Sequence, residues 1–152
     1  MDTAISHPID QPRKTQRDHE RLAHSLIAAW NGREFDRFLG LFSPTYTGTD
    51  VNDPIAQEGY AGICRQTARC LEAFPDLRVS CEAVLADDAR MAVLWTARGT
   101  HRGSYLHIPA THRPIEVRGV AVFTVAGGLI QHGLYVWDTA GVLRALGLLP
   151  HL

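Results

Sequence analysis

The sequence has no excess of one charge and no long apolar run. Its 152 residues include 15 Lys and Arg and 16 Asp and Glu, so the formal net charge at pH 7 is −1. A nearly neutral chain lacks the basic surface by which proteins bind nucleic acid or an anionic membrane. A membrane helix needs roughly 18 uninterrupted apolar residues, which no segment of this sequence provides. We therefore expect neither a nucleic-acid partner nor a membrane partner.

Cysteine is scarce as well. Cys64, Cys70 and Cys81 are an odd number of cysteines and form no CxxC pair. A disulfide framework needs an even number, and a zinc site needs closely spaced ligands. We expect free thiols, which suit a reducing compartment. The first residues also lack the apolar run of a secretory signal, and together these features predict a cytoplasmic protein.

Motifs for cofactors are missing too. The eight histidines include no pair four residues apart with acidic support. The chain has neither a Gly-rich phosphate loop nor a dinucleotide-binding fingerprint. We therefore predict no metal and no cofactor.

The composition is that of one globular domain. Hydrophobic residues make up 45% and charged residues 20% of the chain, and a chain of this length supplies one sizeable core. Residues 1–16 mix Pro, Gln, Thr, Lys and Asp without periodicity. We expect a flexible leader there and a single domain over residues 17–152.

Helical periodicity dominates the first half of the chain. Apolar residues recur at spacings of three and four, which is typical of amphipathic helices. These patterns predict helices over residues 17–30, 34–42 and 59–74. Ser43-Pro44 should end the second helix and Pro75-Asp76 the third. Between them we expect a short strand at 46–48 and a loop over 50–54.

The second half alternates apolar and polar residues with a period of two, as strands do. Strands are predicted over residues 78–86, 91–101, 115–125 and 129–138. Turns at Asp87-Asp88 and Gly127-Gly128 separate neighbouring runs, residues 103–114 form a longer loop, and 141–149 form a short apolar helix. Helices followed by long antiparallel strands predict an α+β domain in which the helices cover one face of a curved sheet. Such a cone would enclose an internal pocket.

Several short motifs occur in a recognisable order, namely Phe74-Pro75-Asp76, Gly99-Thr100-His101-Arg102-Gly103, Ile108-Pro109-Ala110-Thr111-His112-Arg113-Pro114, Val117-Arg118-Gly119-Val120, Gly127-Gly128, Trp137-Asp138 and Leu143-Arg144-Ala145-Leu146-Gly147. Over about residues 17–149, their order and spacing resemble the SnoaL-like polyketide cyclases. The resemblance implies a nuclear-transport-factor-like cone fold and a homodimer packed through the outer sheet face. It also implies an enzyme of secondary metabolism, such as antibiotic biosynthesis, that works without a cofactor.

The chain departs from that family at three positions. Family members that close rings by aldol chemistry carry an Asp three residues before the Asp of the Trp-Asp pair, and here that position is Tyr135. Ala121 and Gly133 stand where many relatives have polar side chains. A tyrosine with an ordinary pKa of about 10 is protonated at neutral pH, so it donates a hydrogen bond rather than accepting a proton. The sequence therefore keeps the scaffold and changes the expected catalyst.

Strand alternation indicates which side chains face the interior. Tyr135 is the first catalytic candidate, as a hydrogen-bond donor and general acid, and the alternative is a core tyrosine bonded to the backbone. The candidates for the base are His101 and Asp50. Asp50 qualifies provided that its strand extends to residue 50. The alternatives are a solvated loop aspartate or helix cap for Asp50 and a loop brace for His101.

Further inward side chains would bind the substrate, and these are Tyr46, Trp95, Trp137, Phe123, Ala121 and Tyr60. His132 and Arg118 have the opposite parity and should face outward, toward a subunit interface or a salt bridge. Asp138 should cap the last helix. Asp53 is a second choice as the replacement carboxylate.

Three functional hypotheses follow. The first is a cofactor-independent cyclase or isomerase that closes a ring in a hydrophobic, polyketide-like intermediate by acid–base and hydrogen-bond catalysis. The second is epoxide hydrolysis, or opening of an epoxide by an internal hydroxyl to form a cyclic ether, because an epoxide oxygen needs a proton donor such as Tyr135. The third is a non-catalytic small-molecule-binding protein, since three polar positions of the family are lost.

Overall fold

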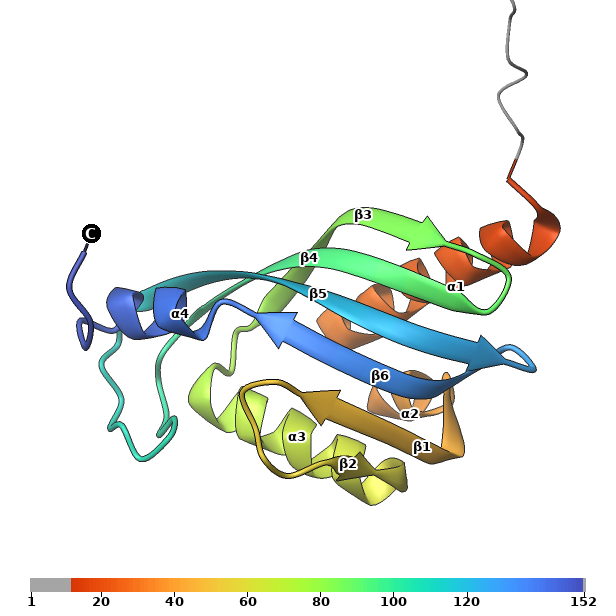
Figure 1. Cartoon of the computed structure of the whole chain (residues 1–152). Helices are drawn as coiled ribbons and strands as arrows, with labels where there is room; N and C mark the ends of the chain where they lie inside the picture. The colour runs from red at the N-terminus through yellow and green to blue at the C-terminus, as the bar shows by residue number, and fades with distance from the viewer. Residues whose placement is uncertain (1–11, 152) are drawn as a thin grey trace, which may run out of the picture.

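The computed structural model describes residues 12–151 (Figure 1). Most helices lie in the first half of the chain, and four long strands follow in the second half. The helices are α1 (Lys14–Asn31), α2 (Phe35–Leu39), α3 (Gly59–Ala73) and α4 (Thr139–Ala145). The strands are β1 (Phe42–Asp50), β2 (Gln57–Glu58), β3 (Arg78–Ala86), β4 (Arg90–Thr100), β5 (Pro114–Ala126) and β6 (Leu129–Trp137). This element order confirms the predicted α+β class.

The six strands form one twisted sheet in the order β2-β1-β6-β5-β4-β3. Neighbouring strands are antiparallel, except that β1 runs parallel to β6. Helix α1 packs on β3 and β4, and α3 packs on β1, so both cover the same side of the sheet (Figure 1). The other side carries no helix among residues 12–151.

Helix α1 begins earlier than the sequence predicts. Its buried residues His19, Ala23, Leu26 and Ala29 recur at helical spacing and face the sheet. Lys14 to Gln16 belong to this helix, which therefore begins three residues before the predicted start at Arg17. The rest of the predicted leader, residues 1–11, lies outside the described residues.

Strand β1 is longer than predicted, and the second helix is shorter. Helix α2 ends at Leu39, and Phe42 begins the strand instead of ending the helix. Phe42 is 1% exposed and packs edge-to-face on Tyr46, with ring centroids 4.9 Å apart. The pairing of β1 with β6 shifts register between Phe42 and Thr47, and Pro44 lies within this irregularity, where the strand tolerates its missing N–H.

The end of the chain also differs from the prediction in detail. Helix α4 begins at Thr139, and the Asp138 side chain accepts a 2.8 Å hydrogen bond from the Gly141 amide, which confirms the predicted cap. Gly147, with φ of +81°, follows the helix, so the predicted extension to residue 149 is wrong. No helix within residues 12–151 is long and apolar enough to cross a membrane.

Candidate active site

Strand β1 reaches Asp50, which meets the condition that the sequence set for this residue. The parallel register of β1 and β6 places Asp50 opposite Tyr135. Asp50 is only 7% exposed, and it is not a solvated loop residue. Trp137 donates its indole N–H to the carboxylate, with Nε1 2.8 Å from Oδ2 and 3.0 Å from Oδ1, and the Asn52 amide donates to Oδ1 at 2.8 Å. The carboxylate is therefore held in one orientation beside Tyr135.

Tyr135 meets a second tyrosine through its hydroxyl group. The Tyr46 and Tyr135 hydroxyl oxygens are 3.1 Å apart. Tyr46 is fully buried, whereas Tyr135 keeps part of its surface accessible. Burial raises the pKa of Tyr46 to about 12 and raises the pKa of Tyr135 well above its usual value. Both side chains are therefore neutral hydrogen-bond donors at physiological pH.

Two glycines make room for this contact. Gly48 on β1 and Gly133 on β6 are register partners, and the Tyr46 ring lies across them. A Cβ at Gly133 would lie 2.5 Å from the Tyr46 hydroxyl oxygen, and a Cβ at Gly48 would clash with the same oxygen. Gly133 stands where the resemblance leads us to expect a polar side chain, and the Tyr46 hydroxyl fills the space that this side chain would enter.

Aromatic side chains surround the pair on the same face of the sheet. Phe123 packs edge-to-face on Tyr135, with ring centroids 5.7 Å apart, and Ala121 is the register partner of Tyr135 on β5. The Trp95 indole lies over Gly119. Burial along β5 and β6 follows the predicted alternation, and this confirms which side chains face the helices.

Solvent reaches part of this face. The buried residues form two clusters, one around Tyr46 and Phe123 and the other around Phe74 and Val117. Trp95 packs against both clusters. Trp95, Tyr135 and Trp137 all face the helices, yet each keeps accessible surface. The predicted internal pocket would lie along these three side chains.

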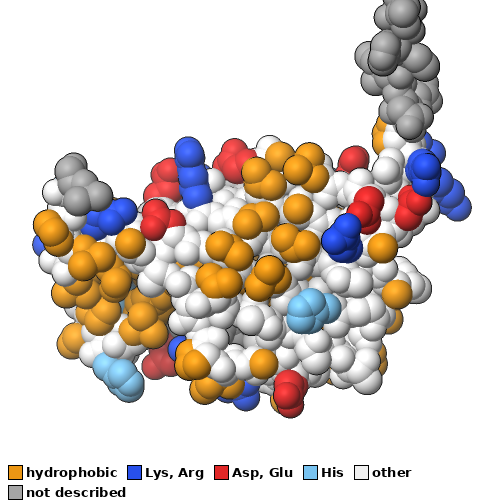
Figure 2. Space-filling model, viewed as in Figure 1, with side chains coloured by type: hydrophobic (Ala, Val, Ile, Leu, Met, Phe, Trp, Pro, Cys, Tyr) orange, Lys and Arg blue, Asp and Glu red, His pale blue; other side chains and the backbone are white. Residues whose placement is uncertain are grey.

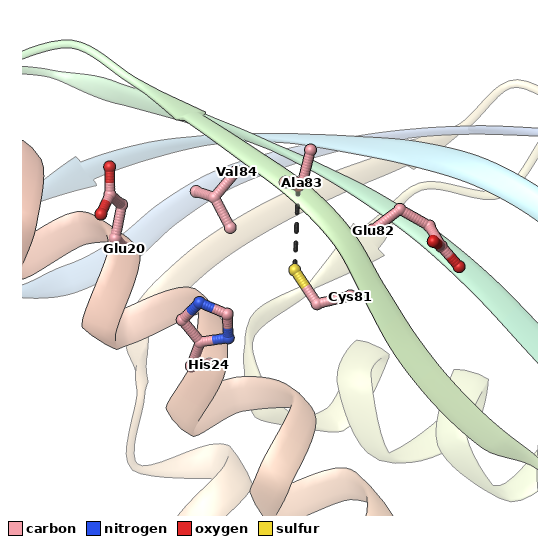
Figure 3. A pocket seen from close by; sticks show the side chains of 6 residues that line it. All are labelled: Glu20, His24, Cys81, Glu82, Ala83 and Val84. Atoms are coloured by element: carbon pink, nitrogen blue, oxygen red, sulfur yellow. Dashed lines mark hydrogen bonds between the residues drawn. The ribbon is translucent and has the colours of Figure 1, made fainter.

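Two hollows lie elsewhere on the described part of the chain. One, of about 280 Å³, lies between α1 and β3 and is lined by Glu20, His24, Cys81, Glu82, Ala83 and Val84 (Figure 3). The other, of about 680 Å³, lies at the ends of β3, β4 and β5 and includes Asp76, Arg78 and Arg98. Neither includes Asp50 or Tyr135.

His101 lies in a different set of contacts. It is fully buried and packs on Phe74, with ring centroids 5.5 Å apart. Its Nδ1 accepts a hydrogen bond from the Thr111 amide at 3.1 Å, so the ring holds residues 101 and 111 of the long loop together. Burial lowers the pKa of His101, which keeps the ring neutral. These contacts match the loop brace that the sequence offered as the alternative to a base.

Other candidates also have definite places. Tyr60 is 39% exposed, and its hydroxyl donates to the Phe42 carbonyl at 3.3 Å rather than to Tyr46 or Tyr135. His132 and Arg118 are exposed on the outer face, as predicted, and the His132 ring lies 2.9 Å from the Thr47 hydroxyl. Asp53 pairs with Arg69 at 2.8 Å in the loop after β1.

Sequence reasoning missed two side chains near Asp50. Burial, with a smaller contribution from the Asp50 charge, raises the pKa of Cys70 to about 11, although the Arg69 charge acts in the opposite direction. Burial also raises the pKa of Tyr105, with smaller contributions from Cys70 and Asp50. The Asp50 charge thus acts on one side chain of α3 and on one side chain of the loop between β4 and β5. The helical position of Cys70, on the face of α3 that packs inward, was the signal that could have found it.

The order of helices and strands defines a nuclear-transport-factor-like α+β domain, and solved structures share it. AclR from Streptomyces galilaeus is 22% identical and aligns with a TM-score of 0.80 over 90% of this chain and 89% of its own. TsrD from Streptomyces laurentii is 22% identical, with a TM-score of 0.79 over 88% of this chain and 98% of its own. A SnoaL-like polyketide cyclase from Agrobacterium tumefaciens is 18% identical, with a TM-score of 0.70 over 84% of this chain and 97% of its own.

The sequence profile of the SnoaL-like polyketide cyclases matches residues 20–146. The chain therefore belongs to the SnoaL-like polyketide cyclase family, and the predicted family and fold are confirmed. A comparison with curated proteins finds no match.

Proposed function

We propose that this protein is a cofactor-independent cyclase or isomerase that acts on a hydrophobic, polyketide-like ketone. The observation that carries the proposal is the pairing of a buried carboxylate, Asp50, with a neutral hydroxyl donor, Tyr135, at opposite positions of neighbouring strands. A base beside a hydrogen-bond donor is the arrangement that proton removal next to a carbonyl needs. Family membership supports the substrate class.

The chemistry balances without a further reactant. The Asp50 carboxylate takes a proton from the carbon next to a carbonyl, while the Tyr135 hydroxyl donates a hydrogen bond to the carbonyl oxygen as it gains negative charge. The enolate carbon then bonds to a second carbonyl carbon of the same molecule, whose oxygen becomes an alkoxide. Asp50 returns its proton to that alkoxide. Return of the proton to a different carbon gives isomerisation instead.

The hydrogen bonds to Asp50 leave it able to act as the base. Trp137 and the Asn52 amide fix the carboxylate, and within residues 12–151 Oδ2 accepts only from the indole. A carboxylate oxygen has two lone pairs, so Oδ2 keeps one for a substrate proton. The Trp95 and Trp137 side chains, which are partly accessible, supply the apolar surface that holds a folded substrate. Phe123, predicted to bind the substrate, is 2% exposed and instead packs against Tyr135 from within the core. His101, which is engaged with Thr111, braces the loop in this proposal.

Proton exchange on a simple ketone tests the proposal without knowledge of the natural substrate. Nuclear magnetic resonance would follow the loss of the α-protons of 2-tetralone in heavy water, with the purified chain as the catalyst. Asp50→Asn should lower the catalysed rate by about 100-fold or more, and Tyr135→Phe by about 10- to 100-fold.

Asp53→Asn is the matched control, because it removes a carboxylate of the neighbouring loop that pairs with Arg69. Its exchange rate should equal that of the unmodified chain. Equal rates for Asp50→Asn and Asp53→Asn would overturn the proposal. Binding of the ketone with no catalysed exchange would favour the third hypothesis, a binding protein.

The hydroxyl pair supports epoxide opening as a second candidate function. Here Asp50 takes a proton from water or from an internal hydroxyl, the oxygen bonds to an epoxide carbon, and the carbon–oxygen bond of the ring breaks. Tyr135 gives its proton to the released oxygen and regains one from Asp50. Hydrolysis of styrene oxide tests this candidate, since the rate of diol formation should exceed the uncatalysed rate only if Asp50 and Tyr135 are both present.

We also propose that the protein forms a homodimer through the sheet face that the helices leave uncovered. Hydrophobic side chains gather over this face (Figure 2). They include Leu94, Leu134 and Val136, which are 37%, 36% and 39% exposed. Burying such a patch against a second copy removes apolar surface from water. A cytoplasmic location stays a prediction of the sequence.

A further inference from the structure

The hydroxyl groups of Tyr46 and Tyr135 carry two hydrogens but share only one hydrogen bond among residues 12–151. Each hydroxyl carries one hydrogen, and the 3.1 Å contact between the oxygens uses only one of the two. Neither hydroxyl has another hydrogen-bond partner among residues 12–151. The second hydrogen must therefore point to something outside the pair.

Burial decides which hydroxyl holds the second hydrogen. Tyr46 is fully buried, and its oxygen lies against the backbone at Gly48 and Gly133. A hydrogen of Tyr46 that pointed away from Tyr135 would be a buried donor with no acceptor, which is unfavourable. Tyr135 is only partly buried as a residue, so of the two side chains it is the one that can meet a ligand. We therefore assign Tyr46 as the donor to Tyr135, an assignment that leaves the hydrogen of Tyr135 for a ligand beside Asp50.

We infer that Tyr46 is a positioning residue, which commits Tyr135 to donate its hydrogen to a ligand oxygen of ketone, quinone or epoxide type. The inference rests on the proposed function for the face on which the ligand binds. Tyr46 cannot touch the ligand itself, because its side chain is fully buried. It acts by holding the Tyr135 oxygen and by polarising its O–H bond through the hydrogen bond that it donates.

The positioning of Tyr135 by Tyr46 also depends on Gly133. A side chain at residue 133 would begin 2.5 Å from the Tyr46 oxygen, so a side chain there and the Tyr46 hydroxyl exclude each other. The edge-to-face contact of Tyr46 with Phe42 keeps the ring from swinging away. A fixed hydroxyl on β1 therefore occupies the space that a side chain on β6 would need.

The carbonyl stretch of a bound ketone tests this inference directly. The probe is 1-tetralone labelled with carbon-13 at its carbonyl, and isotope-edited infrared difference spectra isolate its band. In the unmodified chain the band should lie at lower wavenumber than in Tyr135→Phe, because a donated hydrogen bond weakens the C=O bond. Tyr46→Phe should give an intermediate, broader band, and it should weaken 1-tetralone binding by about twofold to tenfold while leaving tetralin, which has no oxygen, unaffected.

Thr47→Val is the matched control, since Thr47 neighbours Tyr46 on β1 but faces outward toward His132. Its band should match that of the unmodified chain, and circular dichroism would verify that each variant is folded. A Tyr46→Phe band identical to that of the unmodified chain would overturn the inference, since Tyr46 would then be core packing alone. Failure of any 1-tetralone band to shift on binding, or failure of the ketone to bind, would overturn it as well.

Asp50→Asn separates this inference from the proposed function. In one outcome the shifted carbonyl band persists in Asp50→Asn, and the unmodified chain catalyses no α-proton exchange. This outcome would support the positioning of the Tyr135 hydroxyl by Tyr46 and reject the catalytic role of Asp50. The opposite result is catalysed exchange that depends on Asp50, together with a carbonyl band that is the same in Tyr46→Phe and in the unmodified chain. It would reject the inference and leave the proposed function standing.

Discussion

At Gly133, a missing side chain makes room for a hydroxyl group on another strand. In Gly133→Ala the new Cβ would lie 2.5 Å from the Tyr46 oxygen and 3.1 Å from a Phe123 ring carbon. We expect the free energy of unfolding, measured in urea, to fall by about 1–3 kcal/mol, as in other overpacked cores. Tyr46→Phe removes the closest atom, so adding it should recover more than half of that loss.

Gly48→Ala is the comparison that makes this prediction specific. Its Cβ would meet the Tyr46 ring carbon Cζ at 2.9 Å as well as the hydroxyl oxygen. Removing the oxygen leaves that second clash, so Tyr46→Phe should rescue Gly48→Ala little. Equal recovery in the two double-mutant cycles would contradict the geometry of the hydroxyl pair.

Alkaline pH should weaken the fold through the same tyrosine. Burial raises the pKa of Tyr46 from its usual 10.0 to about 12. Its stabilising effect is therefore complete below about pH 10 and is lost as the pH rises toward about 12, because the unfolded chain releases the proton first. Between about pH 8 and pH 11 the unmodified chain should lose roughly 1 kcal/mol more unfolding free energy than Tyr46→Phe. Parallel pH profiles in urea unfolding would show that Tyr46 is not desolvated.

At the scale of elements, the loop between β4 and β5 is tied to the sheet by His101. Its Nδ1 accepts from the Thr111 amide, and the Arg102 and Gly103 amides donate to the Ala73 carbonyl at the end of α3. Burial lowers the pKa of His101 below its usual 6.5. Its contribution to stability is therefore complete above about pH 6.5 and declines as the pH falls through the lowered value.

His101→Asn tests this account of the loop. The asparagine side-chain oxygen can accept from Thr111, but it does not titrate. Between about pH 7.5 and pH 5, the unmodified chain should therefore lose more unfolding free energy than His101→Asn. A steeper loss in the variant would contradict a neutral, desolvated imidazole.

The elements also show how far the sequence could predict this structure. The alternation in β3 to β6 is long, and it predicted the strands and the sides that most of their residues face. Phe42 was misplaced because the helical spacing of Phe35 and Phe38 continues into it, while its pairing with Ile130 on β6 is a contact far along the chain. Two-residue β2 is too short to show any period.

The site was predictable only in part, and for the same reason. Parity indicated that Tyr46, Asp50 and Tyr135 face inward, which the structure bears out. The hydroxyl contact joins residues 89 positions apart, and the Trp137–Asp50 contact joins residues 87 positions apart. No local spacing encodes such contacts, because they depend on the parallel register of β1 and β6.

At the scale of the whole molecule, the uncovered sheet face is the surface through which we propose that two copies associate. Leu134→Asp places a charge in the apolar patch that we propose to lie between two copies, and desolvating an unpaired carboxylate there is costly. Light scattering after size-exclusion chromatography should report a dimer for the unmodified chain and a monomer for Leu134→Asp. Ile55→Asp is the control, because Ile55 is 60% exposed in the loop after β1. A monomeric unmodified chain would contradict the proposed dimer.

The central claim is that Asp50 and Tyr135 act together on one ligand. A crystal structure of the chain soaked with 2-tetralone measures this most directly. The account predicts the ketone oxygen within about 3 Å of the Tyr135 hydroxyl and its α-carbon within about 3.5 Å of Asp50 Oδ2. A ketone bound only in another hollow, or an interior closed by its own side chains around Tyr135, would contradict it.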